Sequence, residues 1–209
     1  MRIDSLKTAP DRAGRYWVTF SDGSRLGLYR QTVEDFGLYT GKEFSEEELQ
    51  QLLDAAGAMS AKMRAVRIVS ASSVSKRDLE QRLVRKGEDP RQAKEAVVWM
   101  EDLHLVDDRN TAEAVVHSCI AKGYGLSRAK QALYEKRIPK EYREEALADY
   151  PDQADRIEAF LRSRLDADSD QKEIKRAIDA LIRRGHSYGT IRNVLNTLSF
   201  DTEEFLEEF

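Results

Sequence analysis

The sequence predicts a mainly α-helical protein: three tandem three-helix repeats in an elongated, curved array, preceded by a small N-terminal segment of β-hairpin and helix. Three observations support this prediction. A short motif recurs three times at nearly equal spacing, the first thirty residues are rich in β-branched and aromatic types, and only 4 prolines and 11 glycines interrupt the 209 residues. Hydrophobic residues make up 41% and charged residues 34% of the chain, which fits thin amphipathic helices better than one thick core.

The first thirty residues are predicted to form β-structure. Residues 16–20 are aromatic or β-branched, Asp22 and Gly23 mark a turn, and residues 25–29 alternate between polar and apolar types. Residues 3–6 are expected to add a third strand. Because an isolated hairpin is only marginally stable in water, this segment should pack against another element.

A helix is expected to begin after Ser45, because Ser45 and Glu48 have the spacing of a capping box. It should run to about Ala56 and end at Gly57. Everything that follows is predicted to be helical. Capping residues and prolines mark the expected helix starts at Ser75, Asp89-Pro90, Asp107 or Asp108, Ile138-Pro139, Tyr150-Pro151 and Ser187.

The recurring motif consists of a small or apolar residue, a leucine four residues later and a basic residue three residues after that. Its leucines, Leu83, Leu133 and Leu181, lie 50 and 48 residues apart. Each copy is expected to form a short helix, followed by a tight turn and a second amphipathic helix.

One more helix is expected before each pair, at residues 60–71, 108–121 and 151–165. Units of this size bury little surface alone, so neighbouring repeats should stack and leave a concave side for a partner. The predicted divisions are residues 1–57 for the N-terminal segment, then 58–105, 106–149 and 150–209 for the three repeats.

Four motifs follow one another along the chain. They are Ser75, Leu79, Leu83, Lys86 and Gly87; residues 104–108 followed by Ala112; residues 122–125 with 136–138; and residues 183–188. In this order and spacing they resemble the repeat motifs of the RecX family, and the hairpin with residues 38–41 resembles the leader of its Gram-positive members. The sequence departs from the family pattern at Thr111, Arg137 and His186, where an aromatic residue, glycine and phenylalanine are more common.

The resemblance implies a regulator that binds the RecA recombinase filament on single-stranded DNA. Such a regulator inhibits strand exchange, ATP hydrolysis and co-protease function, and so acts in recombination, DNA repair and the SOS response. The resemblance implies neither an enzyme activity nor a cofactor.

Charge is segregated along the chain, although the formal net charge is only −4. Residues 122–140 contain six basic residues and one acid, and residues 172–192 contain six basic residues and two acids. Residues 141–170 contain four basic residues and ten acids, and the last nine residues contain five acids. Local basic patches of this kind can attract nucleic acid or an acidic protein surface.

We expect the basic residues to contact the recombinase or DNA in the groove of the filament. The alternative is that they form ordinary solvated helix faces. Tyr124, Tyr134 and Tyr188 lie among them and could stack on unpaired bases, but packing is the favoured role for each. The candidate contacts are Arg82, Arg85, Lys86, Lys122, Arg128, Lys130, Lys136, Arg137, Lys175, Arg176, Arg183 and Arg184.

The sequence offers no catalytic, cofactor or metal site. His104, His117 and His186 have no metal-binding spacing with Cys119, the single cysteine. One cysteine, no signal peptide and no long apolar stretch indicate a cytoplasmic protein without a membrane contact, and we expect a monomer.

Two other functions compete with the filament regulator. A helix-turn-helix DNA-binding protein would need base-contacting side chains on the second helix of a pair. Residues 97–100 of one such helix are instead apolar. A hydrolase or nuclease that uses the aspartates would require metal-dependent turnover, which the sequence does little to support.

Overall fold

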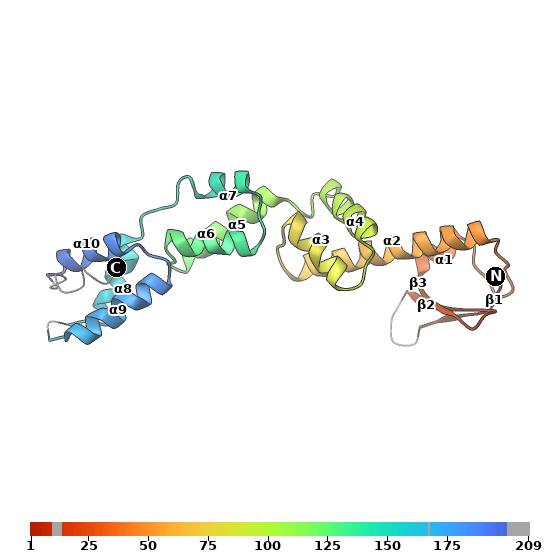
Figure 1. Ribbon diagram of the computed structural model, residues 1–209, viewed down its shortest axis with the longest axis horizontal. Coiled ribbons are helices and arrows are strands. Elements are labelled where there is room, and N and C mark those ends of the chain that lie inside the picture. The colour runs from red at the N-terminus through yellow and green to blue at the C-terminus, as the bar shows by residue number, and fades with distance from the viewer. Residues whose placement is uncertain (10–13, 167, 200–209) are drawn as a thin grey trace. The chain divides into compact units, whose positions relative to one another are not determined.

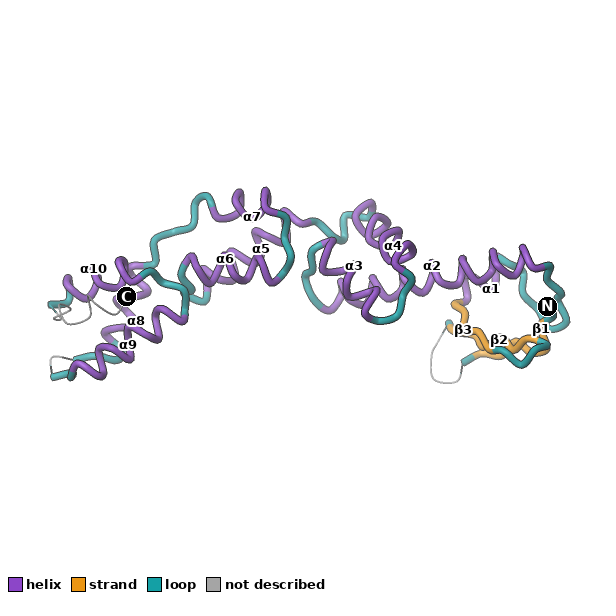
Figure 2. The backbone as a smooth tube through the Cα atoms, in the orientation of Figure 1, coloured by secondary structure: helices purple, strands orange, loops and turns teal. Residues whose placement is uncertain are grey.

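The computed structural model describes residues 1–9, 14–166 and 168–199. Within these residues the protein is mainly helical, with ten α-helices and one small sheet near the N-terminus (Figures 1 and 2). This confirms the predicted fold class of helical repeats after a small β segment. The chain forms two compact units, Met1–Val106 and Asp107–Phe209, and each is described by itself.

The sheet of the first unit has three antiparallel strands in the order β1 (Ile3–Thr8), β2 (Arg15–Phe20) and β3 (Arg25–Tyr29). The predicted hairpin and the third strand are therefore confirmed. Gly23 has a φ of 84° in the turn. This left-handed conformation suits glycine, which has no Cβ.

The sheet packs against a helix, as the sequence required. Val18 and Leu28 lie in one buried cluster with Leu52 and Ala56, which belong to α2 (Glu46–Ala71). A short helix that the sequence analysis did not identify, α1 (Arg30–Asp35), directly follows β3. The N-terminal hairpin is thus stabilised by apolar burial against α1 and α2.

Helix α2 begins where predicted but does not end there. Ser45 Oγ accepts from the Glu48 N–H at 3.1 Å, and Glu48 Oε2 accepts from the Ser45 N–H at 2.8 Å. The predicted end at Gly57 is wrong, because the helix continues to Ala71. A Cβ on Gly57 would lie 2.3 Å from Gln92 Oε1, so the glycine allows a neighbouring helix to approach closely. The predicted division between residues 57 and 58 falls inside this helix.

The second half of α2 packs with α3 (Lys76–Arg85) and α4 (Pro90–Asp102). Ser75 and Asp89 cap these two helices, with Pro90 in the first turn of α4, as predicted. The buried cluster of this region includes Ala65 from α2, Leu79 and Leu83 from α3, and Val97 from α4.

The second unit begins with α5 (Asp108–Ala121), α6 (Leu126–Glu135) and α7 (Lys140–Leu147). Helix α5 has the predicted bounds, and Asp107 Oδ1 caps it by accepting from the Asn110 N–H at 3.0 Å. Pro139 is the N-cap of α7, so this helix starts one residue later than predicted. Ala112, Val116, Leu133 and Ile138 form the buried core of these helices.

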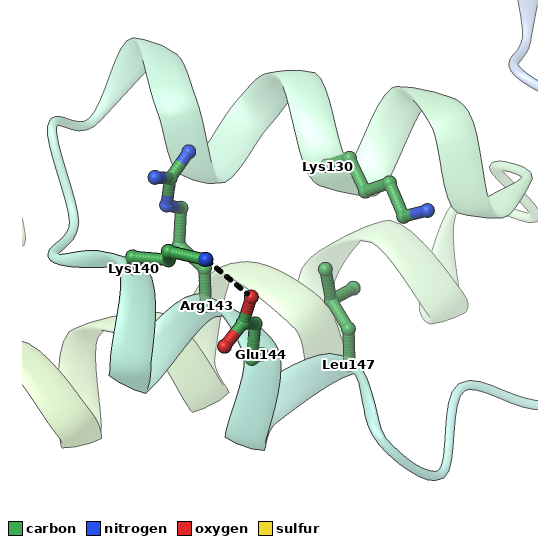
Figure 3. Close-up of a pocket in the computed structure, with 5 residues that line it drawn as sticks. All are labelled: Lys130, Lys140, Arg143, Glu144 and Leu147. Carbon is green, nitrogen blue, oxygen red and sulfur yellow. Dashed lines mark ion pairs between the residues drawn. The ribbon is translucent and has the colours of Figure 1, made fainter.

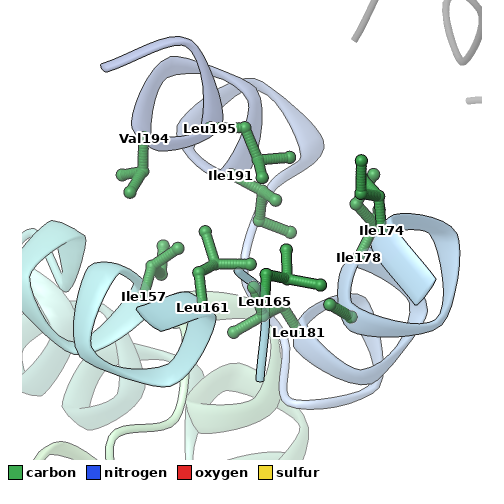
Figure 4. Packing of buried hydrophobic residues seen from close by; sticks show 10 residues of the cluster. Ile157, Leu161, Leu165, Ile174, Ile178, Leu181, Ile191, Val194 and Leu195 are labelled. Carbon is green, nitrogen blue, oxygen red and sulfur yellow. The ribbon is translucent and has the colours of Figure 1, made fainter. Parts of the chain in front are cut away.

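The last three helices are α8 (Ala154–Arg162), α9 (Gln171–Arg183) and α10 (Tyr188–Thr197). Their apolar side chains converge in one cluster, which includes Leu161, Ile178 and Ile191 (Figure 4). Helix α8 is shorter than the predicted range of 151–165. The Ala154 N–H donates to Asp152 Oδ1 at 3.1 Å, and such a local side-chain bond competes with an earlier helix start.

The turn after the first helix of each pair has the same backbone conformation in all three repeats. Gly87, Arg137 and Gly185 have φ values of 90°, 55° and 88°. This left-handed residue directly follows the C-cap, two residues after the last helical residue, and ends the helix. The geometry supports the structural equivalence of the three motif copies.

Candidate functional site

The predicted contact residues divide into two groups by exposure. The exposed group is Arg85, Lys86, Lys122, Lys130, Arg176, Arg183 and Arg184. The half-buried group is Arg82, Arg128, Lys136, Arg137 and Lys175. The first group is the better placed to meet a partner.

In the first unit, only part of the predicted basic set is free to act at a surface. Arg82 pairs with Asp78 at 2.8 Å, and the Asp78 side chain is only 5% exposed. Arg82 also donates to Ser72 Oγ at 3.4 Å. A partly buried ion pair of this kind supports the fold, so Arg85 and Lys86 at the end of α3 are the outward-facing cations.

The second and third repeats are joined by two backbone hydrogen bonds. The Gly125 N–H donates to the Arg184 carbonyl at 3.0 Å, and the Ser127 N–H donates to the Gly185 carbonyl at 3.1 Å. A Cβ on Gly125 would lie 2.2 Å from the Gly185 oxygen. The approach requires glycine at both positions, because a Cβ on either residue would clash with the other segment. The motif at residues 122–125 and the motif at residues 183–188 therefore form one joint.

His186 is buried in this joint. Its side chain donates through Nε2 to the Gly123 carbonyl at 3.1 Å, and the residue is 7% exposed. Burial lowers the pKa of His186, against the opposing effect of that hydrogen bond. Beside it, the Tyr150 hydroxyl donates to the Tyr124 carbonyl at 2.6 Å, and burial raises the pKa of Tyr150 to about 12. Both groups are neutral near pH 7 and hold the joint by hydrogen bonding.

Two of the predicted cations lie at the edges of this joint. Arg128 Nη1 pairs with Glu135 at 3.2 Å. The Arg184 guanidinium lies 4.8 Å from the centre of the Phe160 ring, and Arg164 lies 4.9 Å from the same ring. Phe160 belongs to the apolar face expected for this helix, but nothing in the local sequence pattern indicates that two arginines meet its ring.

A pocket of about 270 Å³ lies between α6 and α7 (Figure 3). Lys130 reaches it from α6, and the other lining residues come from α7. Lys130 is a predicted contact, and Lys140 belongs to the same basic segment, whereas Arg143 lies in the segment 141–170, which is acidic as a whole. The lining residues are Lys130, Lys140, Arg143, Glu144 and Leu147.

The three tyrosines differ in their surroundings. Tyr124 and Tyr188 are half-buried, and Tyr188 packs against the core of the third repeat. Tyr134 is 71% exposed, so the predicted packing role is wrong for this residue. Its position on the outer face of α6 explains the difference, because Leu133 next to it takes the buried position.

The apolar residues of α4 have mostly structural roles. Val97 and Met100 are buried, whereas Val98 is exposed. After Pro90, the other exposed side chains of this helix are charged, with two bases and three acids: Arg91, Lys94, Glu95, Glu101 and Asp102. An outer face with more acids than bases does not favour contact with the phosphates of a duplex, which weakens the helix-turn-helix hypothesis for the first repeat.

In the described part of the chain, no group of three or more histidine, cysteine, aspartate or glutamate side chains is arranged so that it could hold a metal ion. Cys119 is buried, and burial raises its pKa. Among residues 1–9, 14–166 and 168–199, no helix has the length and apolar character needed to cross a bilayer. The acidic last nine residues, 201–209, lie outside the described residues.

Comparison with known protein families matches residues 107–147 to the model described as RecX, second three-helix domain. A protein named Regulatory protein RecX from Clostridioides difficile (strain 630) is 27% identical, and the match covers 96% of each chain. The protein of the same name from Vibrio parahaemolyticus is also 27% identical, over 71% of this chain and 96% of its own length.

Two solved structures share the fold. A crystal structure of regulatory protein RecX aligns with a TM-score of 0.62 and 19% identity, over 93% of this chain and 98% of that one. The crystal structure of RecX from Lactobacillus salivarius aligns with a TM-score of 0.60 and 22% identity, over 69% of this chain and 98% of that one. Together with the motifs in all three repeats, these matches show that the chain is similar to RecX regulatory proteins over almost its whole length and contains a match to a RecX three-helix domain.

Proposed function

We propose that this protein binds the RecA–DNA filament and inhibits the strand exchange, ATPase and co-protease activities of the recombinase. In this proposal it acts in the cytoplasm as a monomer, without a cofactor and without catalysis of its own. The name of its relatives, Regulatory protein RecX, supports a regulatory role. The proposed partner follows from the family resemblance and from the distribution of basic residues.

One observation carries the proposal. The residue that ends the first helix of each pair is basic in all three repeats: Lys86, Lys136 and Arg184 are the C-caps of α3, α6 and α9. A cation at this position also interacts favourably with the helix dipole, by about 0.3–1 kcal/mol. Arg85 and Arg183, one residue earlier in the last turn, are also basic and exposed, whereas the second repeat has Glu135 at this position.

The proposed mechanism uses the repetition of these basic ends. A recombinase filament presents the same surface at each successive subunit, and repeats with equivalent cations could contact several subunits at once. Linked contacts of this kind increase the overall affinity without any single strong contact. The array would lie in the filament groove, compete with incoming duplex and favour disassembly.

The first experiment is a titration of this protein into single-stranded-DNA-dependent ATP hydrolysis by a RecA recombinase from the same source. We expect inhibition well below a stoichiometric ratio, with no ATP consumed by this protein alone. Undiminished ATPase activity at a stoichiometric excess would contradict the proposal. Sequence-specific binding to duplex DNA without that inhibition would favour the helix-turn-helix hypothesis instead.

Reversing the charge of two neighbouring residues tests whether the basic helix ends cause the expected inhibition of ATP hydrolysis. We expect Arg85→Glu with Lys86→Glu to raise the concentration for half-inhibition about tenfold or more, since tenfold corresponds to about 1.4 kcal/mol of binding free energy. Lys94→Glu is the control, because Lys94 is exposed and lies within α4 and not at the end of a motif helix. The control reverses one charge and the pair reverses two, so a control effect of half the binding free energy or more would show that only overall charge matters.

A further inference from the structure

The pocket between α6 and α7 has an excess of positive charge. Lys130, Lys140 and Arg143 line it together with a single carboxylate, Glu144. The carboxylate pairs with Lys140 at 3.5 Å on the same helix, and both side chains are well exposed (Figure 3). Two cations in the pocket are thus not balanced by an acid that lines it.

The two remaining cations have unused hydrogen-bonding capacity. Among the described residues, the Lys130 ammonium makes no ion pair or hydrogen bond. Arg143 Nε is buried without a hydrogen-bond partner. A buried donor without an acceptor costs free energy, and the one acid that lines the pocket, Glu144, pairs with Lys140 instead. Guanidinium and ammonium groups are the side chains that most often bind phosphate oxygens.

An exposed aromatic ring lies beside the pocket. Tyr134 is 71% exposed, and its ring centre lies 5.4 Å from the Arg143 guanidinium carbon. Lys130 and Tyr134 are four residues apart on α6, so they share one face of that helix. A flat ring next to a basic pocket is an arrangement that proteins use to bind unpaired nucleotides.

We infer that this pocket, which we call the α6–α7 pocket, binds one backbone phosphate of a single-stranded nucleic acid while an unpaired base stacks on Tyr134. A duplex does not fit this arrangement, because its bases are stacked on one another. An acidic peptide would satisfy the cations but would leave the Tyr134 ring uncovered. The inference adds a direct nucleic-acid contact to the proposed function, and its test needs no recombinase, so either can fail while the other stands.

The test is fluorescence anisotropy of a labelled oligothymidine with the full-length protein over a range of salt concentrations. Tyr134→Leu should weaken binding about tenfold, the effect expected for loss of one stacked base, with little change in salt dependence. Lys130→Gln should lower the slope of log K against log salt by about 0.7, the value for one lost phosphate contact on a single strand. Tyr134→Phe should keep near-normal affinity, because the ring is retained.

Matched controls and an abasic ligand make the result specific. Tyr39→Leu and Lys94→Gln remove an exposed ring and an exposed cation of the first unit, and neither should change binding. On an abasic oligonucleotide the Tyr134→Leu effect should disappear, whereas the Lys130→Gln effect should persist. Arg143 stays intact in all variants, because its contact with Tyr134 also supports the pocket.

Three outcomes would overturn the inference. The first is absence of binding to the oligonucleotide at low salt. The second is binding that both pocket variants leave unchanged, which would place the nucleic-acid contact elsewhere. The third is competition by a polyglutamate peptide that depends on Lys130 but not on Tyr134, which would assign the pocket to an acidic protein segment.

Discussion

His186 links the stability of the second unit to pH. The folded protein holds this side chain neutral, because burial lowers its pKa from the ordinary value of 6.5. When pH falls through about 6.5, the unfolded chain binds a proton that the folded chain does not, so stability decreases. The loss should stop once the pH is below the folded pKa, because both states are then protonated.

We therefore expect the urea midpoint of the second unit to be lower at about pH 5.5 than at about pH 7.5, and His186→Phe to reduce this difference. The relevant measurement is urea unfolding of both proteins at the two pH values. His104 and His117 are exposed and remain in the variant, so they serve as an internal control. The same pH difference in both proteins would show that His186 is not the titrating group.

A comparison of alanine substitutions at two glycines distinguishes the free-energy cost of backbone strain from the cost of a steric clash. Gly87 and Gly185 have nearly the same φ, but a Cβ on Gly87 meets open space, whereas a Cβ on Gly185 lies 2.3 Å from the Arg128 nitrogen. We expect Gly87→Ala to cost about 1–2 kcal/mol from conformation alone. Gly185→Ala should cost about 1–3 kcal/mol more, from the clash with α6.

Urea unfolding of the unit that holds each glycine measures the two free-energy losses. Equal losses would mean that the second and third repeats are not held as closely as the backbone distances indicate.

At the scale of a whole helix, α2 continues through Gly57 because of its packing with α4. Gln92 Nε2 donates to the Asp54 carbonyl at 3.2 Å, and its amide occupies the space above Gly57. A glycine inside a helix is less favourable than alanine by about 1 kcal/mol. The helix accepts this cost because the close contact with Gln92 needs it.

A double-mutant cycle tests this explanation. Gly57→Ala alone should change stability little, since the gain in helix propensity is offset by displacement of Gln92. In a Gln92→Ala background, the same change should stabilise the protein by about 0.5–1 kcal/mol. Urea unfolding of the four proteins gives the coupling energy, and additive effects would refute the proposed contact.

At the scale of the whole molecule, the chain has two units with separate cores. The clusters around Leu52 and Leu83 belong to the first unit, and those around Leu133 and Leu181 belong to the second. Each unit buries its own apolar side chains, and such units can fold alone. The curvature of the repeat array stays a prediction.

We expect residues 1–106 and 107–209, expressed separately, each to be helical and to melt cooperatively. Far-ultraviolet circular dichroism against temperature measures both properties for each fragment. The full-length chain should then deviate from a single two-state transition. If neither fragment showed a cooperative melt, the cores would depend on each other and the division into units would be incorrect.

The sequence by itself determined most of the local structure. Ser45, Ser75, Asp89 and Asp107 cap the helices that they were predicted to cap, because a cap depends only on residues a few positions away. The repeated leucines are buried for the same kind of reason, since helical periodicity fixes which face is apolar. The left-handed turns at Gly87 and Gly185 also follow from local sequence, whereas Arg137 adopts the same conformation without glycine.

Only the tertiary structure decided how distant segments meet. Gly57 was predicted to end a helix and instead admits Gln92, and Gly125 and Gly185 proved to be two sides of one joint. The α6–α7 pocket combines two lysines from the basic segment 122–140 with an arginine from a segment that is acidic overall. Such contacts depend on the shapes of surfaces far apart in sequence, and neither composition nor periodicity contains that information.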